Sequence, residues 1–363
     1  MSDIKRVPLS LSRNYVRNWT VQGAIRELIA NALDQGDYEL DCNYGLNINS
    51  YGATIPEETL LLGNGSKTDG DENIGQFNEG YKIALLVLCR EGVSVEIQNG
   101  LDKWTPSIEH SELYNTECLH VTIEYGYYDE DDCVKIDLSD LDSSIIADVE
   151  ANTLVMQDDY EKHETPYGDI LLGEEHKGRI YVGGLFVDNF KSDYGFDFPP
   201  SEFPLDRDRK SLNPFEVKWK TQYLWGHVSK QDDEEVAEEI IKGISRRDES
   251  FEYASVTATD SIKKVAETIY NEQYSGKLVV SSYDEFKEEQ AAGNKVELVN
   301  NDKLVRIIQQ TDCYKTFSLG ANKVEKKSIE DLLDDFKDKW QDEMSSEMFY
   351  AYEDMVELIN KQL

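Results

Sequence analysis

The sequence predicts an α+β fold, in which helical segments and short strands alternate along the chain. Apolar residues recur at helical spacing over residues 22–35, and short segments typical of strands occupy residues 45–50, 94–98 and 119–125. The chain has 363 residues, of which 39% are hydrophobic and 10% aromatic. This length and composition allow several hydrophobic cores, so we expect more than one domain.

Residues 22–35 are the best-defined helix of this prediction. Apolar residues beginning at Ile25 share one side of it, and Glu27, Asn31 and Asp34, at positions i, i+4 and i+7, share another. A carboxylate and an amide placed in this way orient a water molecule and complete the shell of a magnesium ion that carries phosphate oxygens. An ordinary solvated helix face is the alternative interpretation of the same residues.

A glycine-rich stretch over residues 63–80 precedes an apolar helix over residues 81–88. Glycines before a helix leave backbone N–H groups open, so these groups can hold phosphates at the positive end of the helix. The run GQFNEGYK, from Gly75 to Lys82, has this form. It is not a Walker P-loop, because no Gly-Lys-Ser/Thr follows, and it lacks the strand–glycine–helix order of a dinucleotide fold.

The pattern restarts at Gly178 with GRIYVGGLFV, a run typical of a β-hairpin, and the four remaining prolines fall between Pro199 and Pro214. Helix-like and strand-like segments alternate over residues 255–310, which predicts a small α/β module. A charged tail over residues 328–363, with leucine and phenylalanine at helical spacing, predicts one or two exposed helices. We therefore place the domains at residues 1–170, 171–250, 251–325 and 326–363.

Charge and cysteine content argue against several classes of protein. The formal charge is −36, from 73 acidic and 37 basic residues, so we expect neither direct nucleic-acid binding nor contact with anionic membranes. Acidic clusters at residues 129–132 and 232–235 are compatible with mimicry of DNA, although such clusters are more often solvated surface. The five cysteines form no C-x-x-C pair, and no segment resembles a signal peptide or a membrane span, so we expect a cytoplasmic protein.

Two segments resemble the ATP-binding boxes of the GHKL proteins, the group that contains gyrase, the heat shock protein 90 chaperones, histidine kinases and MutL. RELIANALD, residues 26–34, resembles the E-x-x-x-N-x-x-D box, and IGQFNEGYKIA, residues 74–84, resembles the lid-end glycine box. Both are most similar to the heat shock protein 90 chaperones, and a lid-sized interval separates them. The resemblance implies a Bergerat-type α/β sandwich, followed by a transducer-like α/β domain, the small module and the helical tail.

The resemblance also implies a role for each residue of the two boxes. Glu27 would be the general base on water, Asn31 the protein ligand of Mg²⁺, and Asp34 and Ser50 would lie around the adenine base. The remaining contacts to ATP would come from the strand after the first box, the lid interval and the glycine box: Gly52, Lys67, Gly75, Gln76, Phe77, Gly80 and Lys82.

The likeness continues into the second predicted domain, where RIYVGGLFVDNF is followed by FPLDRDRKSL. In the chaperones this segment is a strand pair and then a loop whose arginine reaches the γ-phosphate. By position, Arg209 corresponds to that arginine. Lys210 is the alternative, because other GHKL proteins use a lysine from the equivalent domain. The likeness covers about residues 4–217 and does not extend to the last third of the chain.

The sequence departs from the family at the adenine-binding box, which is normally D-x-G-x-G. Aligning Gly52 and the residues after it places Ser50 where the aspartate would accept the adenine amino proton. A serine hydroxyl accepts that proton without the help of a negative charge, which predicts weaker or less selective base binding. Asn49 would be the acceptor if the strand carries a bulge, and Asp41 or Asp71 if the alignment is shifted.

We therefore expect a Mg²⁺-dependent ATPase that uses nucleotide-driven conformational change or dimer closure to act on a protein or DNA partner. Two alternatives stay open: a nucleotide-gated binding module with little turnover, and an acidic inhibitor that imitates DNA. From these 363 residues we expect neither a gyrase-like cleavage domain nor a sensor kinase with a histidine-phosphorylation segment before the first box. The expectation is a compact stand-alone ATPase of phage or mobile-element origin.

Overall fold

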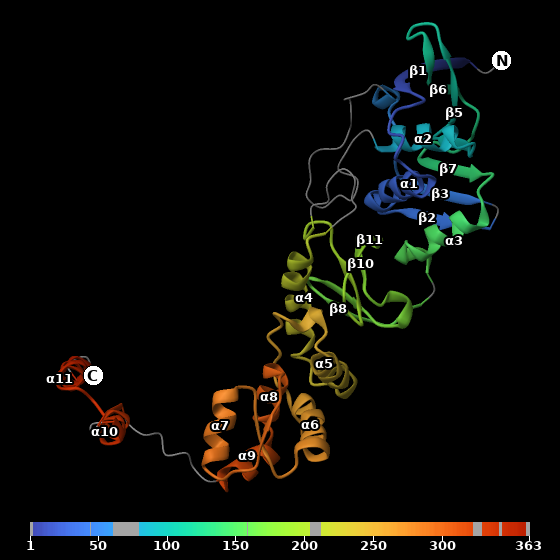
Figure 1. Ribbon diagram of the computed structural model, residues 1–363. Helices are drawn as coiled ribbons and strands as arrows, with labels where there is room; N and C mark the ends of the chain where they lie inside the picture. Colours follow the sequence, from blue (N-terminus) through green and yellow to red (C-terminus); the bar gives the residue numbers. More distant parts are fainter. Residues whose placement is uncertain are drawn as a thin grey trace. The chain divides into compact units, whose positions relative to one another are not determined.

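A computed structural model of the protein describes residues 3–43, 45–60, 80–157, 159–203, 212–321, 329–340 and 343–360. Helices and strands are mixed along the chain, which confirms the predicted α+β class. The chain divides into two compact units, Met1–Thr259 and Asp260–Leu363, of which the first contains both large sheets (Figure 1).

The first sheet has seven strands in the order β1-β6-β5-β4-β7-β3-β2, and every neighbouring pair is antiparallel. One face of this sheet is apolar and faces the main hydrophobic core of unit 1. The strands are β1 (Ile4–Ser12), β2 (Tyr38–Asp41), β3 (Leu46–Tyr51), β4 (Ser94–Asn99), β5 (Asp102–Ser111), β6 (Thr116–Glu124) and β7 (Cys133–Ser139).

Helices α1 (Val21–Gln35) and α2 (Gly80–Arg90) pack against each other and against the first sheet, and α3 (Ser143–Ala151) packs against α1. Helix α1 begins where the Thr20 hydroxyl accepts a hydrogen bond from the Gly23 N–H, and it ends at Gly36, which takes a positive φ of 87°. The predicted helices over residues 22–35 and 81–88 are thus confirmed, with ends that differ by one or two residues.

The second sheet of unit 1 has the order β11-β10-β12-β9-β8, and helices α4 (Pro214–Val228) and α5 (Glu234–Arg246) follow it. The predicted hairpin is confirmed, because β10 and β11 pair antiparallel across Gly183 and Gly184, both of which have positive φ. The strands are β8 (Lys162–Thr165), β9 (Gly168–Leu171), β10 (Arg179–Val182), β11 (Leu185–Asn189) and β12 (Gly195–Phe198).

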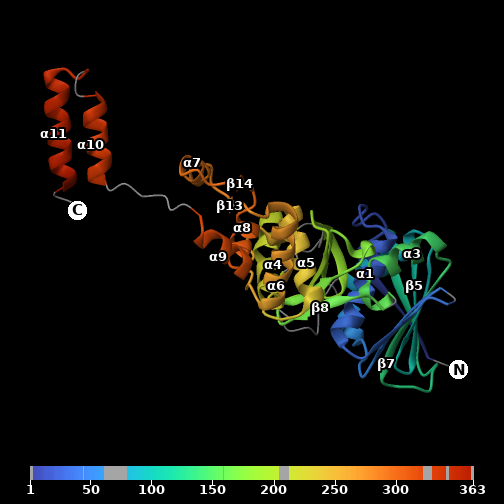
Figure 2. The same ribbon diagram turned by 90° about the horizontal axis from the view of Figure 1, so that it is seen from below.

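Unit 2 contains the predicted small α/β module, with a parallel pair of strands, and the predicted helices of the tail. Figure 2 shows the last two helices running side by side, where the Tyr352 hydroxyl donates to the Leu333 carbonyl. No helix of the described residues is both long enough and apolar enough to cross a membrane. The elements are α6 (Asp260–Ile269), β13 (Leu278–Val280), α7 (Tyr283–Ala291), β14 (Val296–Leu298), α8 (Asp302–Ile308), α9 (Asp312–Leu319), α10 (Ile329–Trp340) and α11 (Ser346–Asn360).

Candidate functional site

The carboxyl group of Glu27 lies against Gly80, the first residue of α2. Glu27 projects from the middle of α1 and is buried, with 6% of its surface exposed. A Cβ atom at Gly80 would collide with this carboxyl group, so a larger residue there would displace the Glu27 side chain. Since a helix N-terminus carries a partial positive charge, the fold brings a buried carboxylate to a site that favours anions.

Asn31 lies one turn after Glu27 on the same helix. Its side-chain Nδ2 donates to the Glu27 carbonyl oxygen at 2.8 Å, and this bond fixes the orientation of the amide. The amide oxygen Oδ1 is therefore on the side of the group that faces away from that carbonyl. Asn31 also lines a cavity on the neighbouring face of α1, whereas Glu27 does not line it.

This cavity, called here the α1–α2 cavity, lies between α1, α2 and strands β3, β4 and β7. Its volume is about 190 Å³, whereas a single water molecule needs only ~10–15 Å³. Its walls are mainly apolar, with a few hydroxyl and amide groups, as is usual for small-molecule sites. The lining residues are Leu28, Asn31, Ala32, Gln35, Ile48, Ser50, Ala53, Thr54, Ile55, Pro56, Thr59, Tyr81, Leu85, Ile97, Val134 and Ile136.

Hydrogen bonds hold the loop wall of the α1–α2 cavity in place. The Asn99 side chain accepts from the Ile55 N–H at 2.7 Å and donates to the Ile55 carbonyl at 2.8 Å. The hydroxyls of Thr59 and Tyr81 lie 2.8 Å apart, and burial raises the pKa of Tyr81 to about 12. The buried Lys82 ammonium donates to the Thr59 carbonyl at 2.7 Å. Lys82, a predicted ATP contact, is thus anchored to the cavity wall.

Strand alternation distinguishes the candidate adenine acceptors. Ser50 and Ile48 are two residues apart on β3, and both line the α1–α2 cavity. Asn49 lies between them and therefore faces the other side of the sheet. The pairing of β3 with β2 and β7 is continuous through this point, without a bulge. The Asp41 carboxylate accepts from the Asn43 N–H at 3.3 Å and does not line the cavity.

Two further predicted residues are in the described part of the chain. Gly52 has a φ of 73°, a left-handed conformation that favours glycine, and its N–H donates to the Asp132 carbonyl at 3.0 Å. Asp34 is half-buried and does not line the α1–α2 cavity. The other predicted residues lie outside the described ranges: Lys67, Asp71, Gly75, Gln76, Phe77, Arg209 and Lys210.

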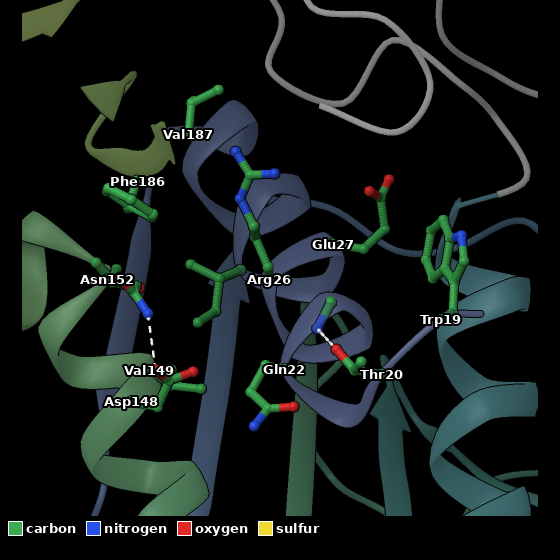
Figure 3. A pocket seen from close by; sticks show the side chains of 13 residues that line it. Trp19, Thr20, Gln22, Arg26, Glu27, Asp148, Val149, Asn152, Phe186 and Val187 are labelled. Atoms are coloured by element: carbon green, nitrogen blue, oxygen red, sulfur yellow. Dashed lines mark hydrogen bonds between the residues drawn. The ribbon is translucent and has the colours of Figure 1, made fainter. Parts of the chain in front are cut away.

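A second cavity, of about 230 Å³, adjoins Glu27 (Figure 3). It lies between the first half of α1, the end of α3 and strand β11. Figure 3 shows Arg26 extending toward Val187 of β11, whereas Glu27 projects on another side of α1. The Asn152 side chain donates to Asp148 at 3.1 Å on the α3 wall. Sequence reasoning missed this cavity, because its three walls come from segments that share no motif.

The donor groups around Glu27 fit a magnesium ion that carries phosphates better than a metal held by the protein alone. Within the described ranges, no three histidine, cysteine, aspartate or glutamate side chains are grouped to hold a metal. Mg²⁺ keeps several waters and takes one or two protein oxygens beside substrate phosphates. A single amide oxygen, as at Asn31, is compatible with that mode of binding.

Comparison with known proteins gives one distant relative and no family assignment. No family model matches the sequence. An uncharacterized protein of Mycoplasma pneumoniae is 26% identical over 224 residues, which cover 55% of this chain and 89% of the relative. Because no activity is named for that relative, the comparison adds no functional assignment to the geometry above.

Proposed function

We propose that this protein is a GHKL-type ATPase, which binds ATP with Mg²⁺ at the α1–α2 cavity and hydrolyses it. The observation that carries the proposal is the meeting of two segments far apart in sequence. The buried carboxylate of Glu27 lies against the start of α2 at Gly80, beside a cavity that Asn31 borders. These three features correspond to the general base, the phosphate cradle and the base site that the family resemblance implies.

The base would occupy the α1–α2 cavity, whose apolar walls include Ile48 and Leu85. Ser50 would accept a hydrogen bond from its amino group, and the phosphates would extend toward the N-terminus of α2. The dipole of a helix favours negative charge at its N-terminus. In a chain with a formal charge of −36, such local positive potential is needed to hold a polyphosphate.

Glu27 would accept a proton from the water that attacks the γ-phosphate. Its burial limits competition from bulk solvent for the water positioned there. Asn31, oriented by its bond to the Glu27 backbone, would hold Mg²⁺ through its side-chain oxygen. The bound ion would neutralise charge on the phosphates.

Mg²⁺-ATP should stabilise the protein against heat. Ligand at about 100 times its Kd adds about 2.7 kcal/mol to the free energy of unfolding, which raises the Tm of a domain of this size by about 5 °C or more. Differential scanning fluorimetry with ATP, with and without EDTA, measures the shift. Ala53→Trp, which fills the α1–α2 cavity, should abolish it, and Ala151→Trp on the exposed end of α3 should not. No shift in the parent protein would refute the proposal.

Ser50→Asp should tighten ATP binding and increase selectivity over GTP, because a charged acceptor replaces a neutral one. The gain expected from a charge-assisted hydrogen bond is about tenfold in Kd. Calorimetric titration with ATP and GTP measures both effects. Asn49→Asp is the matched control, since its side chain faces the other side of β3 and should leave the affinity unchanged. Equal effects of the two substitutions would place the base contact elsewhere.

Gly80→Ala should slow ATP turnover by about tenfold or more while the protein stays folded. The added methyl displaces the flexible end of Glu27, so the general base loses its position. Circular dichroism must show that Gly80→Ala is folded, because its Cβ would collide with the buried Glu27 side chain. Gly226→Ala in α4 is the control, since its Cβ would meet only an ordinary contact of 3.5 Å. If Gly80→Ala hydrolyses ATP at the parental rate, the contact between Glu27 and Gly80 is not needed for catalysis.

A nucleotide-gated binding module with negligible turnover is the second candidate. The neutral hydroxyl at Ser50, in place of the family's aspartate, favours it because base affinity without a charged acceptor is lower. Phosphate release under single-turnover conditions distinguishes the two candidates. A module of this kind would show the thermal shift with Mg²⁺-ATP and no burst or steady release of phosphate.

A further inference from the structure

Helix α4 carries large apolar side chains on two different faces. One face is buried and includes Val217, Leu224 and Trp225. The other presents Phe215, Trp219 and Tyr223, at positions i, i+4 and i+8, with exposed fractions of 58%, 47% and 44%. Such spacing aligns the three rings along one side of the helix, over about two turns. The core of unit 1 does not use this aromatic row, which is exposed.

Rings from two other segments extend this row. Tyr253 lies beside Phe215 and Trp219, with ring centroids at 5.7 and 5.9 Å. Tyr167, from the turn between β8 and β9, lies 5.5 Å from Tyr223. We call these five residues the α4 aromatic surface. Contacts between the rings restrict their rotamers, so a partner that binds them loses less conformational entropy.

The buried face of α4 is already complete without these residues. The Trp225 ring stacks on Phe251 with centroids 4.2 Å apart, and its Nε1–H donates to the Ser250 hydroxyl at 3.0 Å. The Thr221 hydroxyl donates to the Ser250 carbonyl at 2.9 Å. The exposed row therefore does not result from a poorly packed helix. Clustered, exposed aromatic side chains are typical of interaction sites, where tryptophan and tyrosine contribute most of the binding energy.

Among the described residues, the lysines beside the aromatic surface are paired with carboxylates. Lys218 is paired with Glu249 at 2.8 Å and with Glu252 at 2.7 Å. Lys220 is paired with Glu202 at 2.6 Å. Both lysines next to Trp219 are thus neutralised, and Glu216 on the same helix is exposed. We call the carboxylates of Glu202, Glu216, Glu249 and Glu252 the rim of the aromatic surface. Together with the net charge of −36, this rim disfavours a nucleic acid or a second copy of the chain and favours a cationic partner.

We propose that the α4 aromatic surface binds a basic amphipathic helix of a partner protein. The apolar side of that helix would cover Phe215, Trp219 and Tyr223, whose spacing matches anchors at i, i+3 or i+4, and i+7 on a facing helix. Its lysines and arginines would contact the rim carboxylates and the ring faces. This inference is independent of the proposed ATPase activity, since no residue of the α1–α2 cavity or of Glu27's surroundings takes part.

The test uses the full chain and two fluorescein-labelled peptides of the same helical Leu pattern, one with lysine and one with glutamate at the polar positions. Fluorescence anisotropy should show binding of the Leu/Lys peptide and none of the Leu/Glu peptide. Any acidic protein attracts a basic peptide, so the deciding comparison is between variants. Trp219→Ala should raise the Kd of the Leu/Lys peptide at least tenfold, as removal of a central aromatic anchor typically does. Tyr127→Ala, at an aromatic residue 54% exposed elsewhere in unit 1, should leave its Kd unchanged.

If Trp219→Ala loses its native circular dichroism spectrum, Tyr223→Ser serves as a second variant. It should also raise the Kd of the Leu/Lys peptide. An unchanged Kd in a folded Trp219→Ala or Tyr223→Ser variant would overturn the proposal. Tight binding of the Leu/Glu peptide would do the same, because the rim charge would then not select the partner. The proposal would also be overturned if the chain self-associates or binds an oligonucleotide and Trp219→Ala abolishes that binding. The surface would then have another occupant.

Discussion

Glu27→Ala should bind Mg²⁺-ATP about as tightly as the parent protein and hydrolyse it at least ~10²-fold more slowly. A general base acts in the hydrolytic step, so its removal affects turnover far more than binding. The position of Glu27, buried against Gly80 at the start of α2, is consistent with this role. Single-turnover phosphate release measures the step, and calorimetric titration measures the affinity.

Two further substitutions make the Glu27 result specific. Glu27→Gln keeps the size of the side chain but removes its charge and basicity and replaces one acceptor oxygen with an NH2 donor. Its turnover should therefore fall as in Glu27→Ala. Glu91→Ala removes an exposed carboxylate just after α2 and should hydrolyse ATP at the parental rate. Parental turnover in both Glu27 variants would rule out the ATPase proposal as stated. If both variants lose ATP binding, the role of Glu27 is instead structural, namely to position the start of α2.

Arg209→Ala should lower turnover by about 10²–10³-fold, the usual effect of removing one group that stabilises transition-state charge. This prediction depends on the family resemblance, because Arg209 and Lys210 lie outside the described residues. ADP affinity should be nearly unchanged, since ADP lacks the phosphate that the arginine would contact. Steady-state turnover and ADP titration measure the two quantities.

Lys210→Ala tests the alignment that selects Arg209. If the lysine is the residue that reaches the γ-phosphate, Lys210→Ala should show the loss of turnover and Arg209→Ala should not. Parental turnover in both variants would mean that the second sheet and its loops do not complete the site. The chain would then contain an ATP-binding domain beside a module with a separate role.

The elements predicted correctly have strong local patterns. Helix α1 combines an apolar stripe, a threonine N-cap and a glycine at its end, and the β10–β11 hairpin has glycines at its turn. Strand β5 was missed, because it contains Pro106, which is rare in a central strand. Strand β4 pairs with β5 only over Asp102–Trp104, so the missing N–H of Pro106 interrupts no bond to β4, and Pro106 lies opposite Val121 of β6. That outcome depends on register, which a single sequence does not reveal.

The sequence by itself determined which residues share a helix face and which segments begin at a glycine, because helical periodicity and backbone freedom are local properties. It placed Glu27, Asn31 and Asp34 on one stripe of α1. Only the tertiary structure decided that Asn31 borders the α1–α2 cavity and Asp34 does not, and that Ser50 rather than Asn49 faces it. It also decided which of the two aromatic faces of α4 is buried. Periodicity defines faces, but the long-range contacts that cover a face arise only when distant segments pack together.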